Sequence, residues 1–159
     1  MKENNYLELI KNANVYAVAK KSSLDHAVLI SSKLNNTVLL KREDKQRTFS
    51  FKVRGAFNKI NQLSAKELEN GVICSSAGNH AQGVALASKI NKNSAKVVMP
   101  ITSPSIKIDA VKSLGAEEIL HGDNYDEAFT KAKEIEKKES SASSHWPHYW
   151  QHKLNTHSS

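Results

Sequence analysis

The chain has a single cysteine, Cys74, among its 159 residues, so it cannot form an internal disulfide. It has no apolar run near the ~18 residues of a membrane-spanning helix, and its mean hydropathy is -0.52. Residues 1–14 are polar and lack the apolar core and small-residue cleavage site of a secretory signal. These absences argue against a disulfide-stapled secreted fold and against a membrane partner, and they favour a cytoplasmic location.

Long tracts of like charge are also missing, although the chain is basic, with a net charge of +7 and a pI of about 9.4. Such a charge permits attraction to phosphates or nucleic acid. The densest basic pairs are only residues 20–21, 41–42 and 137–138, and there is no groove-reading motif. A solvated basic surface therefore explains the excess, and we predict no nucleic-acid partner; salt-dependent retention on DNA would support the rival view.

Strand and helix patterns alternate through the second half of the chain. Residues 72–74 predict a buried strand, and 95–99 and 118–120 predict two further strands. Helices are expected over 79–90, 106–114 and 124–138. Ser64 with Glu67 matches a capping box, and Gly115 stands where a helix commonly ends in a left-handed residue. This order predicts an α/β fold, a parallel sheet with crossover helices.

The first half is less regular. We expect a short helix over 1–13, and a second helix over 24–34, capped by Ser22 or Ser23, with Val28 and Leu29 facing inward. Residues 37–40 predict a buried strand. Residues 50–63 predict a helix whose apolar positions recur at helical spacing, namely Val53, Phe57 and Ile60.

Residues 140–159 differ from the rest of the chain. They contain a serine run, both tryptophans and four of the seven histidines, and they have neither helical nor strand periodicity. We expect an unrelated, disordered tail of the kind that a shifted reading frame produces. A metal site would be the alternative, but no cysteine or carboxylate accompanies the histidines, so no metal is predicted; the histidines are His145, His148, His152 and His157.

Lys52 is the first candidate for chemistry, since it stands among Phe49, Phe51 and Val53. Apolar neighbours remove water from an ammonium group and favour the free amine, which Schiff-base chemistry needs. Taken alone, the pattern is more typical of a lysine that extends to solvent along apolar surface.

The second candidate is the run of small and polar residues 75–83, between a predicted strand and a predicted helix. Small residues let the backbone approach a ligand, and the free N–H groups of a helix N-terminus favour a carboxylate or phosphate. The alternative is a tight turn with Asn79 as its cap. The run is neither a GxGxxG fingerprint nor a P-loop, so a dinucleotide or nucleoside triphosphate is not indicated.

The segment around Lys52 and the run 75–83, taken together, indicate a family far more specifically than either does alone. Residues 41–44, 50–56 and 76–83 closely resemble the threonine dehydratase and serine racemase family of pyridoxal-phosphate (PLP) enzymes. Residues 98–100, 106–111, 114–117 and 121–128 also resemble that family, and the likeness runs from about Asn14 to Glu139. Residues 15–19 and Ala77 are more similar to the dehydratases. The resemblance implies a fold-type II PLP-enzyme (tryptophan synthase beta-like) architecture, truncated in this chain.

The resemblance also implies roles for individual residues. Lys52 would bind PLP covalently and move the α-proton of the substrate, Phe51 would lie beside the cofactor ring, and Asn79 would bind its phenolic oxygen. A substrate-binding loop would hold the carboxylate of the amino acid through backbone N–H groups; it comprises Ser76, Ala77, Gly78, Asn79 and His80. The reaction implied is deamination of threonine or serine to 2-oxobutanoate or pyruvate plus ammonia, with PLP as the electron sink.

Some features of the family are missing. Ser23 and Gln46-Arg47 stand where the family usually has a proline and Gln-Pro. Nothing after Glu139 matches the glycine-rich phosphate loop or the polar residue that faces the pyridine nitrogen, and no apolar run marks a fourth strand near 141–146. We therefore expect residues 1–73 to be the N-terminal part of the large PLP-binding domain, and 74–139 a small α/β domain lacking its last strand. The apolar faces around Leu39, Phe57 and Ile60 are expected to lack partners.

Such a chain is expected to be inactive or nearly so. The alternative is a non-catalytic fragment that binds an amino-acid carboxylate, forms a homo-oligomer or pairs with a full-length relative; co-purification with that relative would support it. Isoleucine biosynthesis is the pathway that the resemblance suggests. The residues leave open threonine against serine as substrate, and a biosynthetic against a catabolic role.

Overall fold

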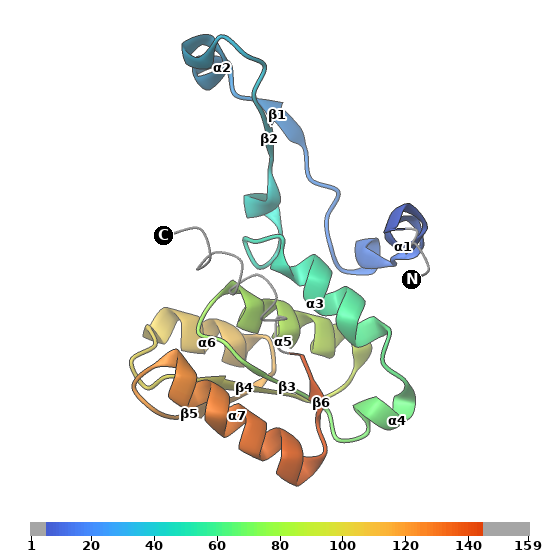
Figure 1. The fold of residues 1–159 in the computed structure, drawn as a ribbon, viewed down its shortest axis with the longest axis vertical. Coiled ribbons are helices and arrows are strands. Elements are labelled where there is room, and N and C mark those ends of the chain that lie inside the picture. Colours follow the sequence, from blue (N-terminus) through green and yellow to red (C-terminus); the bar gives the residue numbers. More distant parts are fainter. Residues whose placement is uncertain (1–5, 145–159) are drawn as a thin grey trace, which may run out of the picture.

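The computed structural model describes residues 6–144, which form a layered α/β body with a projecting arm (Figure 1). Its sheet has four strands in the order β5-β4-β3-β6, and all neighbours are parallel. The strands are β3 (Val72–Ser75), β4 (Ala95–Met99), β5 (Glu117–Leu120) and β6 (Ala142–Ser143). The α/β class and the parallel sheet predicted from the sequence are confirmed.

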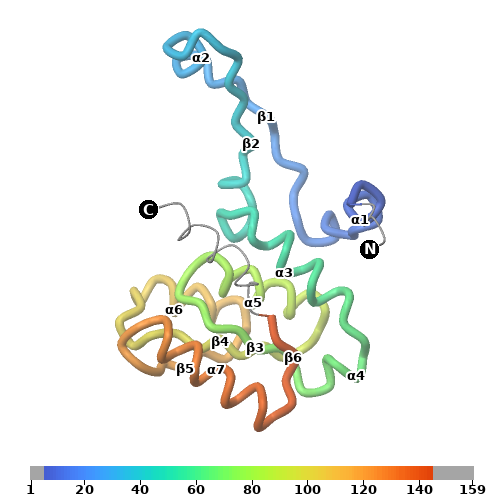
Figure 2. Tube along the Cα trace, viewed as in Figure 1, coloured from blue at the N-terminus to red at the C-terminus, as the bar shows by residue number. Residues whose placement is uncertain are grey.

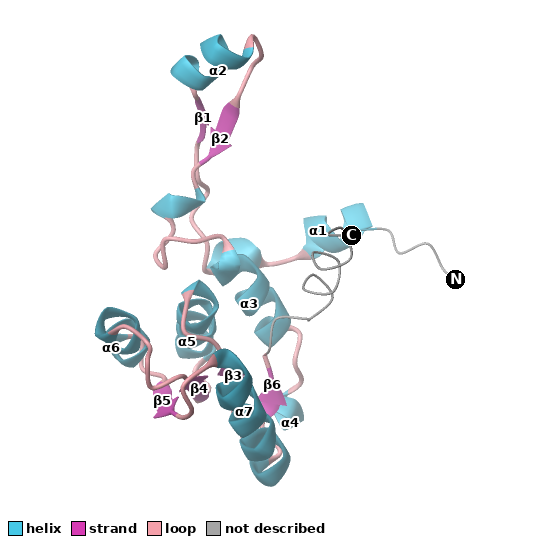
Figure 3. Cartoon of the chain, turned by 60° about the vertical axis from the view of Figure 1, so that its left-hand side comes forward, coloured by secondary structure: helices cyan, strands magenta, loops and turns pink. Residues whose placement is uncertain are grey.

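Both faces of the sheet are covered because the central strands are apolar on both sides. Alternate residues of β3 and β4, among them Cys74 and Val97, belong to a core shared with α5 (Asn79–Asn91) and α6 (Ser105–Ser113). Ile73 and Val98 point the other way and pack with α7 (Tyr125–Glu139). The two layers lie on opposite sides of the sheet (Figure 3).

A further helix, α3 (Lys52–Asn61), packs on the outer side of α5. Its buried residues are Val53, Ala56, Phe57 and Ile60, as the helical spacing predicted. Phe57 and Ile60 are only 2% and 0% exposed, so the expectation that they lack partners is wrong. The reason is that the alanine-rich α5 is buried from residue 80 to residue 88, so it packs on the sheet with one side and on α3 with the other.

The arm, residues 24–41, consists of β1 (Leu24–His26), α2 (Val28–Leu34) and β2 (Leu39–Lys41). The two strands pair antiparallel, with Leu24 opposite Lys41 and His26 opposite Leu39. The traced chain shows the arm reaching away from the body (Figure 2). The remaining short elements are α1 (Tyr6–Asn12), η1 (Val15–Ala17), η2 (Glu43–Lys45) and α4 (Ala65–Leu68).

The sequence predictions for the arm were right for the helix α2 and the strand β2 but wrong about the start of the helix and about burial. The predicted helix over 24–34 is a strand for its first three residues, because residues 24–26 pair with β2. Val28 and Leu29, expected inward, are 63% and 79% exposed, and β2, expected buried, is exposed along its length. Periodicity shows which face is apolar but not whether anything covers it, and nothing within residues 6–144 covers this face.

The end of the described chain differs from the prediction as well. Residues 142–143 form a fourth strand beside β3, and the Ser144 N–H donates to the Ile73 carbonyl at 2.9 Å. The strand was missed because its ladder uses backbone groups and needs no apolar run. Residues 145–159, including the four histidines considered for a metal, lie outside the described residues. No helix in the described part of the chain is long and apolar enough to cross a membrane.

Candidate active site

Lys52 is the first residue of α3 and is half-buried. Its backbone N–H donates to Ser50 Oγ at 3.2 Å, and the Arg54 N–H donates to the Phe51 carbonyl at 3.0 Å. These bonds use amides of the first helical turn, which have no partner within the helix itself. The lysine is therefore fixed at the point where the loop 46–51 becomes a helix.

The second predicted segment, residues 76–80, lies directly beyond the C-terminal end of β3 and leads into α5. The Ser76 N–H donates to the Val98 carbonyl at 3.1 Å, and the Gly78 N–H donates to Ser76 Oγ at 3.3 Å. The carboxyl ends of parallel strands are where open α/β sheets bind their ligands. The loop is thus placed at the sheet edge where a site is expected.

The start of α3 and the first half of α5, distant in the sequence, meet in the structure. A Cβ built on Gly83 of α5 would lie 3.2 Å from the Lys52 carbonyl oxygen, so the two helices touch through backbone at this point. Lys52 is also close enough to His80 for its charge to affect the histidine's pKa. The structure thus brings the candidate lysine beside the N-terminal turn of α5.

His80 is buried, and its Nε2 lies 2.6 Å from the Ser144 carbonyl oxygen. A carbonyl only accepts, so Nε2 donates. Burial is the main cause that lowers the pKa of His80 from its ordinary 6.5; the Ser144 carbonyl opposes this change, and the Lys52 charge adds to it. His80 is therefore a neutral imidazole at pH 7, tied by its ring to the end of β6.

The N-terminus of α5 is open to a ligand. Gly78, its N-cap, has no side chain with which to cap the helix, and a Cβ at Gly78 would meet no atom within 4 Å. Ser76, Ala77 and Asn79 are half-buried. Uncapped N–H groups and the helix dipole favour an anion such as a carboxylate. With the amine of Lys52 and the carboxamide of Asn79, the donor set fits the aldehyde and phenolic oxygen of PLP.

One expectation about Lys52 does not hold. Phe49 and Phe51, expected to surround it with apolar groups, are 76% and 54% exposed, and only Val53 is buried. The two aromatic residues precede α3 in a loop, where neighbouring side chains are not forced onto a common face. Phe51 is therefore exposed rather than packed around Lys52.

Sequence reasoning missed an ion pair beside Lys52. Arg54 donates to both carboxylate oxygens of Glu43, through Nε at 2.8 Å and Nη2 at 2.9 Å. The bond from Arg54 is the main cause that lowers the pKa of Glu43 to about 2. Both residues stand in segments that carry the family resemblance. Their positions, one before and one after Lys52 along the chain, were the only signal in the sequence, and they do not show that the two side chains meet.

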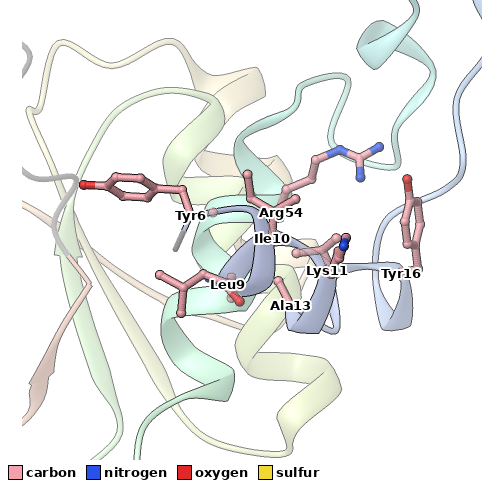
Figure 4. Close-up of a pocket in the computed structure, with 10 residues that line it drawn as sticks. Tyr6, Leu9, Ile10, Lys11, Ala13, Tyr16 and Arg54 are labelled. Atoms are coloured by element: carbon pink, nitrogen blue, oxygen red, sulfur yellow. The ribbon is translucent and has the colours of Figure 1, made fainter. Parts of the chain in front are cut away.

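A pocket of about 480 Å³ lies on another face of α3, against α1 (Figure 4). Tyr6, Leu9, Ile10 and Tyr16 form its apolar wall, with Arg54 at its edge. None of the predicted site residues lines it, so it is separate from the candidate active site.

Comparison with known proteins identifies the family to which the chain is similar. The family model of pyridoxal-phosphate dependent enzymes matches residues 20–157, which includes most of the segment set apart as a tail. The chain is 52% identical over 134 residues to threonine dehydratase 2 of Solanum lycopersicum, covering 84% of this chain and 22% of that protein. It is 49% identical over 130 residues to the biosynthetic L-threonine dehydratase of Pasteurella multocida, covering 82% and 25%.

Solved structures give the same result. The processed form of threonine deaminase isoform 2 from Solanum lycopersicum superposes with a TM-score of 0.83 at 51% identity, covering 87% of this chain and 40% of that one. Maize serine racemase superposes with a TM-score of 0.80 at 26% identity, covering 85% and 41%. The chain spans between a fifth and a quarter of the curated relatives named above. On this evidence the chain belongs to the family of pyridoxal-phosphate dependent enzymes, with the fold-type II architecture that its sequence suggested.

Proposed function

We propose that Lys52 binds PLP covalently and that this site belongs to an enzyme that deaminates threonine or serine to 2-oxobutanoate or pyruvate plus ammonia. The observation that carries the proposal is the backbone contact between Lys52, at the start of α3, and Gly83 of α5. The Lys52 charge also lowers the pKa of His80 in the first turn of α5. An amine and an anion-binding helix end side by side are what an amino-acid substrate on PLP requires. The relatives' names, threonine dehydratase and threonine deaminase, support the choice of reaction.

Each residue has a defined part in this proposal. The N–H groups of Ser76 to His80 hold the substrate carboxylate, and the Asn79 carboxamide binds the phenolic oxygen of the cofactor. The Lys52 amine would take the α-proton of the substrate. PLP, when bound, supplies the electron sink that makes this proton acidic. His80, neutral and tied to Ser144, keeps the loop in place without adding a positive charge next to Lys52.

We further propose that the chain by itself binds PLP weakly and has no measurable turnover. Its six glycines are dispersed, so residues 1–159 contain no glycine-rich loop for the cofactor phosphate. Hydrogen bonds to charged groups contribute about 1.5–3 kcal/mol each, so several missing bonds weaken binding by orders of magnitude. Production of 2-oxobutanoate by the purified chain would contradict this part of the proposal.

The test is a PLP titration followed by visible absorbance, then borohydride reduction and mass mapping of peptides. We expect label on Lys52 that disappears in Lys52→Ala and persists in Lys59→Ala, a lysine of the same helix that is exposed. Label spread evenly over surface lysines, unchanged in Lys52→Ala, would refute the assignment of Lys52.

A second candidate function, association with an intact relative or with another copy, is favoured by the arm. Seven large apolar side chains of the arm are between 44% and 79% exposed, and they are Leu24, Val28, Leu29, Ile30, Leu34, Leu39 and Leu40. Exposed apolar surface of this extent commonly marks an interface. If the arm associates, Leu29→Glu lowers co-purification with a full-length threonine dehydratase or shifts sedimentation toward the monomer. Ile106→Glu, at a position 73% exposed on α6, is the matched control.

We propose the cytoplasm as the location of this protein. The chain has one cysteine and therefore does not depend on an internal disulfide, which fits a reducing compartment such as the cytoplasm. Several relatives are named chloroplastic or mitochondrial, as in Solanum lycopersicum and Saccharomyces cerevisiae. Fractionation of cells that express the tagged chain, with organelle markers, distinguishes these compartments.

A further inference from the structure

We propose that Glu43 is a positioning residue for Lys52. It closes a polar clamp, defined as Glu43, Gln46 and Arg54 with the backbone of Lys20, that forces the loop before α3 through a left-handed turn at Phe49. The inference rests on the proposed role of Lys52, but the clamp and the turn are features of the structure in their own right.

The clamp joins three segments. Glu43, in η2, receives two hydrogen bonds from Arg54 in the first turn of α3, at 2.8 and 2.9 Å. Ser22 Oγ donates to the same carboxylate at 2.5 Å. The Glu43 and Arg54 side chains are only 16% and 22% exposed, so water screens this pair less than a pair on the open surface. The two ends of the loop 46–51 are thereby held at a fixed distance.

Gln46 anchors the start of that loop a second time. Its side chain is 2% exposed and makes a two-way bond with Lys20, accepting from the Lys20 N–H and donating to the Lys20 carbonyl, both at 2.8 Å. Arg54 Nη2 donates to the same carbonyl at 3.3 Å. The backbone of Lys20 therefore links the residues on either side of the loop.

Between these anchors the backbone is strained. Phe49 has φ of +53°, a left-handed conformation that is rare and unfavourable for a bulky residue. The side chain is 76% exposed, so its own packing does not offset that cost. The Phe49 N–H donates to the Gln46 carbonyl at 2.9 Å, and three residues later Lys52 begins the helix. Strain of this kind persists only where surrounding contacts impose it, and the clamp supplies those contacts.

A matched control is next to Glu43 in the chain. Asp44 also pairs with an arginine, Arg42, at 2.7 Å, but its side chain is 59% exposed and the pair spans only two residues. Loss of that charge changes a surface ion pair of small effect. Comparison of Glu43→Gln with Asp44→Asn therefore separates the clamp from a general effect of removing one carboxylate.

The experiment has two measurements on the full chain. The first is hydrogen exchange of the Phe49 and Lys52 amides, which needs no cofactor. The second is the ratio of Lys52 to Lys59 label after PLP and borohydride treatment. Glu43→Gln should speed exchange at Phe49 about tenfold and lower the labelling ratio several-fold, whereas Asp44→Asn should leave both within about twofold of the unaltered chain.

A rescue variant makes the test specific. Asparagine adopts the left-handed conformation more readily than phenylalanine, so Phe49→Asn reduces the strain that the clamp must hold. The double variant Glu43→Gln/Phe49→Asn should recover the labelling ratio, and a merely structural role of Glu43 predicts no recovery. If Glu43→Gln does not fold, Arg54→Lys, which keeps the charge but loses the two-point bond, replaces it.

Two results would overturn the proposal: unchanged exchange and labelling in Glu43→Gln, or a lowered ratio that Phe49→Asn does not restore. Absence of Lys52 label in the unaltered chain would refute the proposed role of Lys52. The exchange measurement would then still decide whether the clamp holds the turn, so the two failures are distinguishable.

Discussion

Gly83 lies against the backbone of Lys52, where a Cβ would stand 3.2 Å from the Lys52 carbonyl oxygen and 3.3 Å from the Val53 Cα. This contact lets α5 and α3 approach closely enough to bury Val53 and Ala56 between them. It also sets the distance from the candidate lysine to the N-terminus of α5. A glycine inside a helix costs stability of its own, so its place here is explained by the close approach.

Gly83→Val should therefore be destabilising. The branched side chain must displace backbone rather than a flexible side-chain end, and overpacking of this kind typically costs about 1–3 kcal/mol. Denaturant unfolding followed by circular dichroism measures the change. Gly78→Ala is the control, since a Cβ there meets nothing within 4 Å; equal losses in both variants would show that the α3–α5 contact is not the cause.

The layered body could be predicted from the sequence because its signals are local. β3 and β4 are short, largely apolar segments, β5 follows a helix that ends at a glycine, and the capping box at Ser64 and the left-handed Gly115 are present as expected. The arm could not be predicted in the same way. Its apolar positions fit a helical face equally well, and only the pairing of residues 24–26 with 39–41 decides for a strand. Likewise β6 depends on backbone pairing to a distant strand, which side-chain pattern does not encode.

Asn124→Ala should destabilise the N-terminal end of α7, of which Asn124 is the N-cap. Asn124 Oδ1 accepts from the Glu127 N–H at 3.0 Å, and its Nδ2 donates to the Glu127 carboxylate at 2.9 Å. Loss of an N-cap residue costs about 1 kcal/mol, which thermal unfolding detects as a lower Tm. Thr130→Ala, at an exposed site whose hydroxyl bonds back to the Asp126 carbonyl, should be neutral or slightly stabilising. If Asn124 does not stabilise the helix, the two variants should have the same Tm.

The Glu43–Arg54 pair predicts a specific loss of stability in acid. The bond from Arg54 lowers the pKa of Glu43 from its ordinary 4.5 to about 2, so the folded state binds this proton less readily than the unfolded state. The contribution is complete above about pH 4.5 and is lost as pH falls through about 2. Glu43→Gln should accordingly show a smaller fall in unfolding free energy over that range than the unaltered chain. Parallel pH curves for the two proteins would mean that the pair gives no net stabilisation.

The sequence pointed to the candidate site residues, but it did not point to the residues that hold them in position. Lys52 and residues 76–80 stand out because a lysine motif and a small-residue loop have recognisable composition. Glu43 and Arg54 carry no such signal, since most opposite charges at that separation never meet. Phe49 was read as an apolar neighbour of Lys52, whereas its exposed, left-handed conformation follows from contacts made by other residues.

Cys74 offers a direct test of the centre of the sheet. It is 0% exposed in β3, and burial raises the pKa of its thiol to about 12. The reactive thiolate is thus scarce and shielded at pH 8, and as the only cysteine it gives the whole signal in a thiol assay. The native chain should leave an aromatic disulfide reagent unreacted over the time in which urea-unfolded chain reacts completely. Labelling should instead follow the rate of global opening, as expected for a core strand. Rapid reaction without denaturant would mean that β3 opens readily, and then the loop at residues 76–80 would have no rigid support from which to hold a substrate.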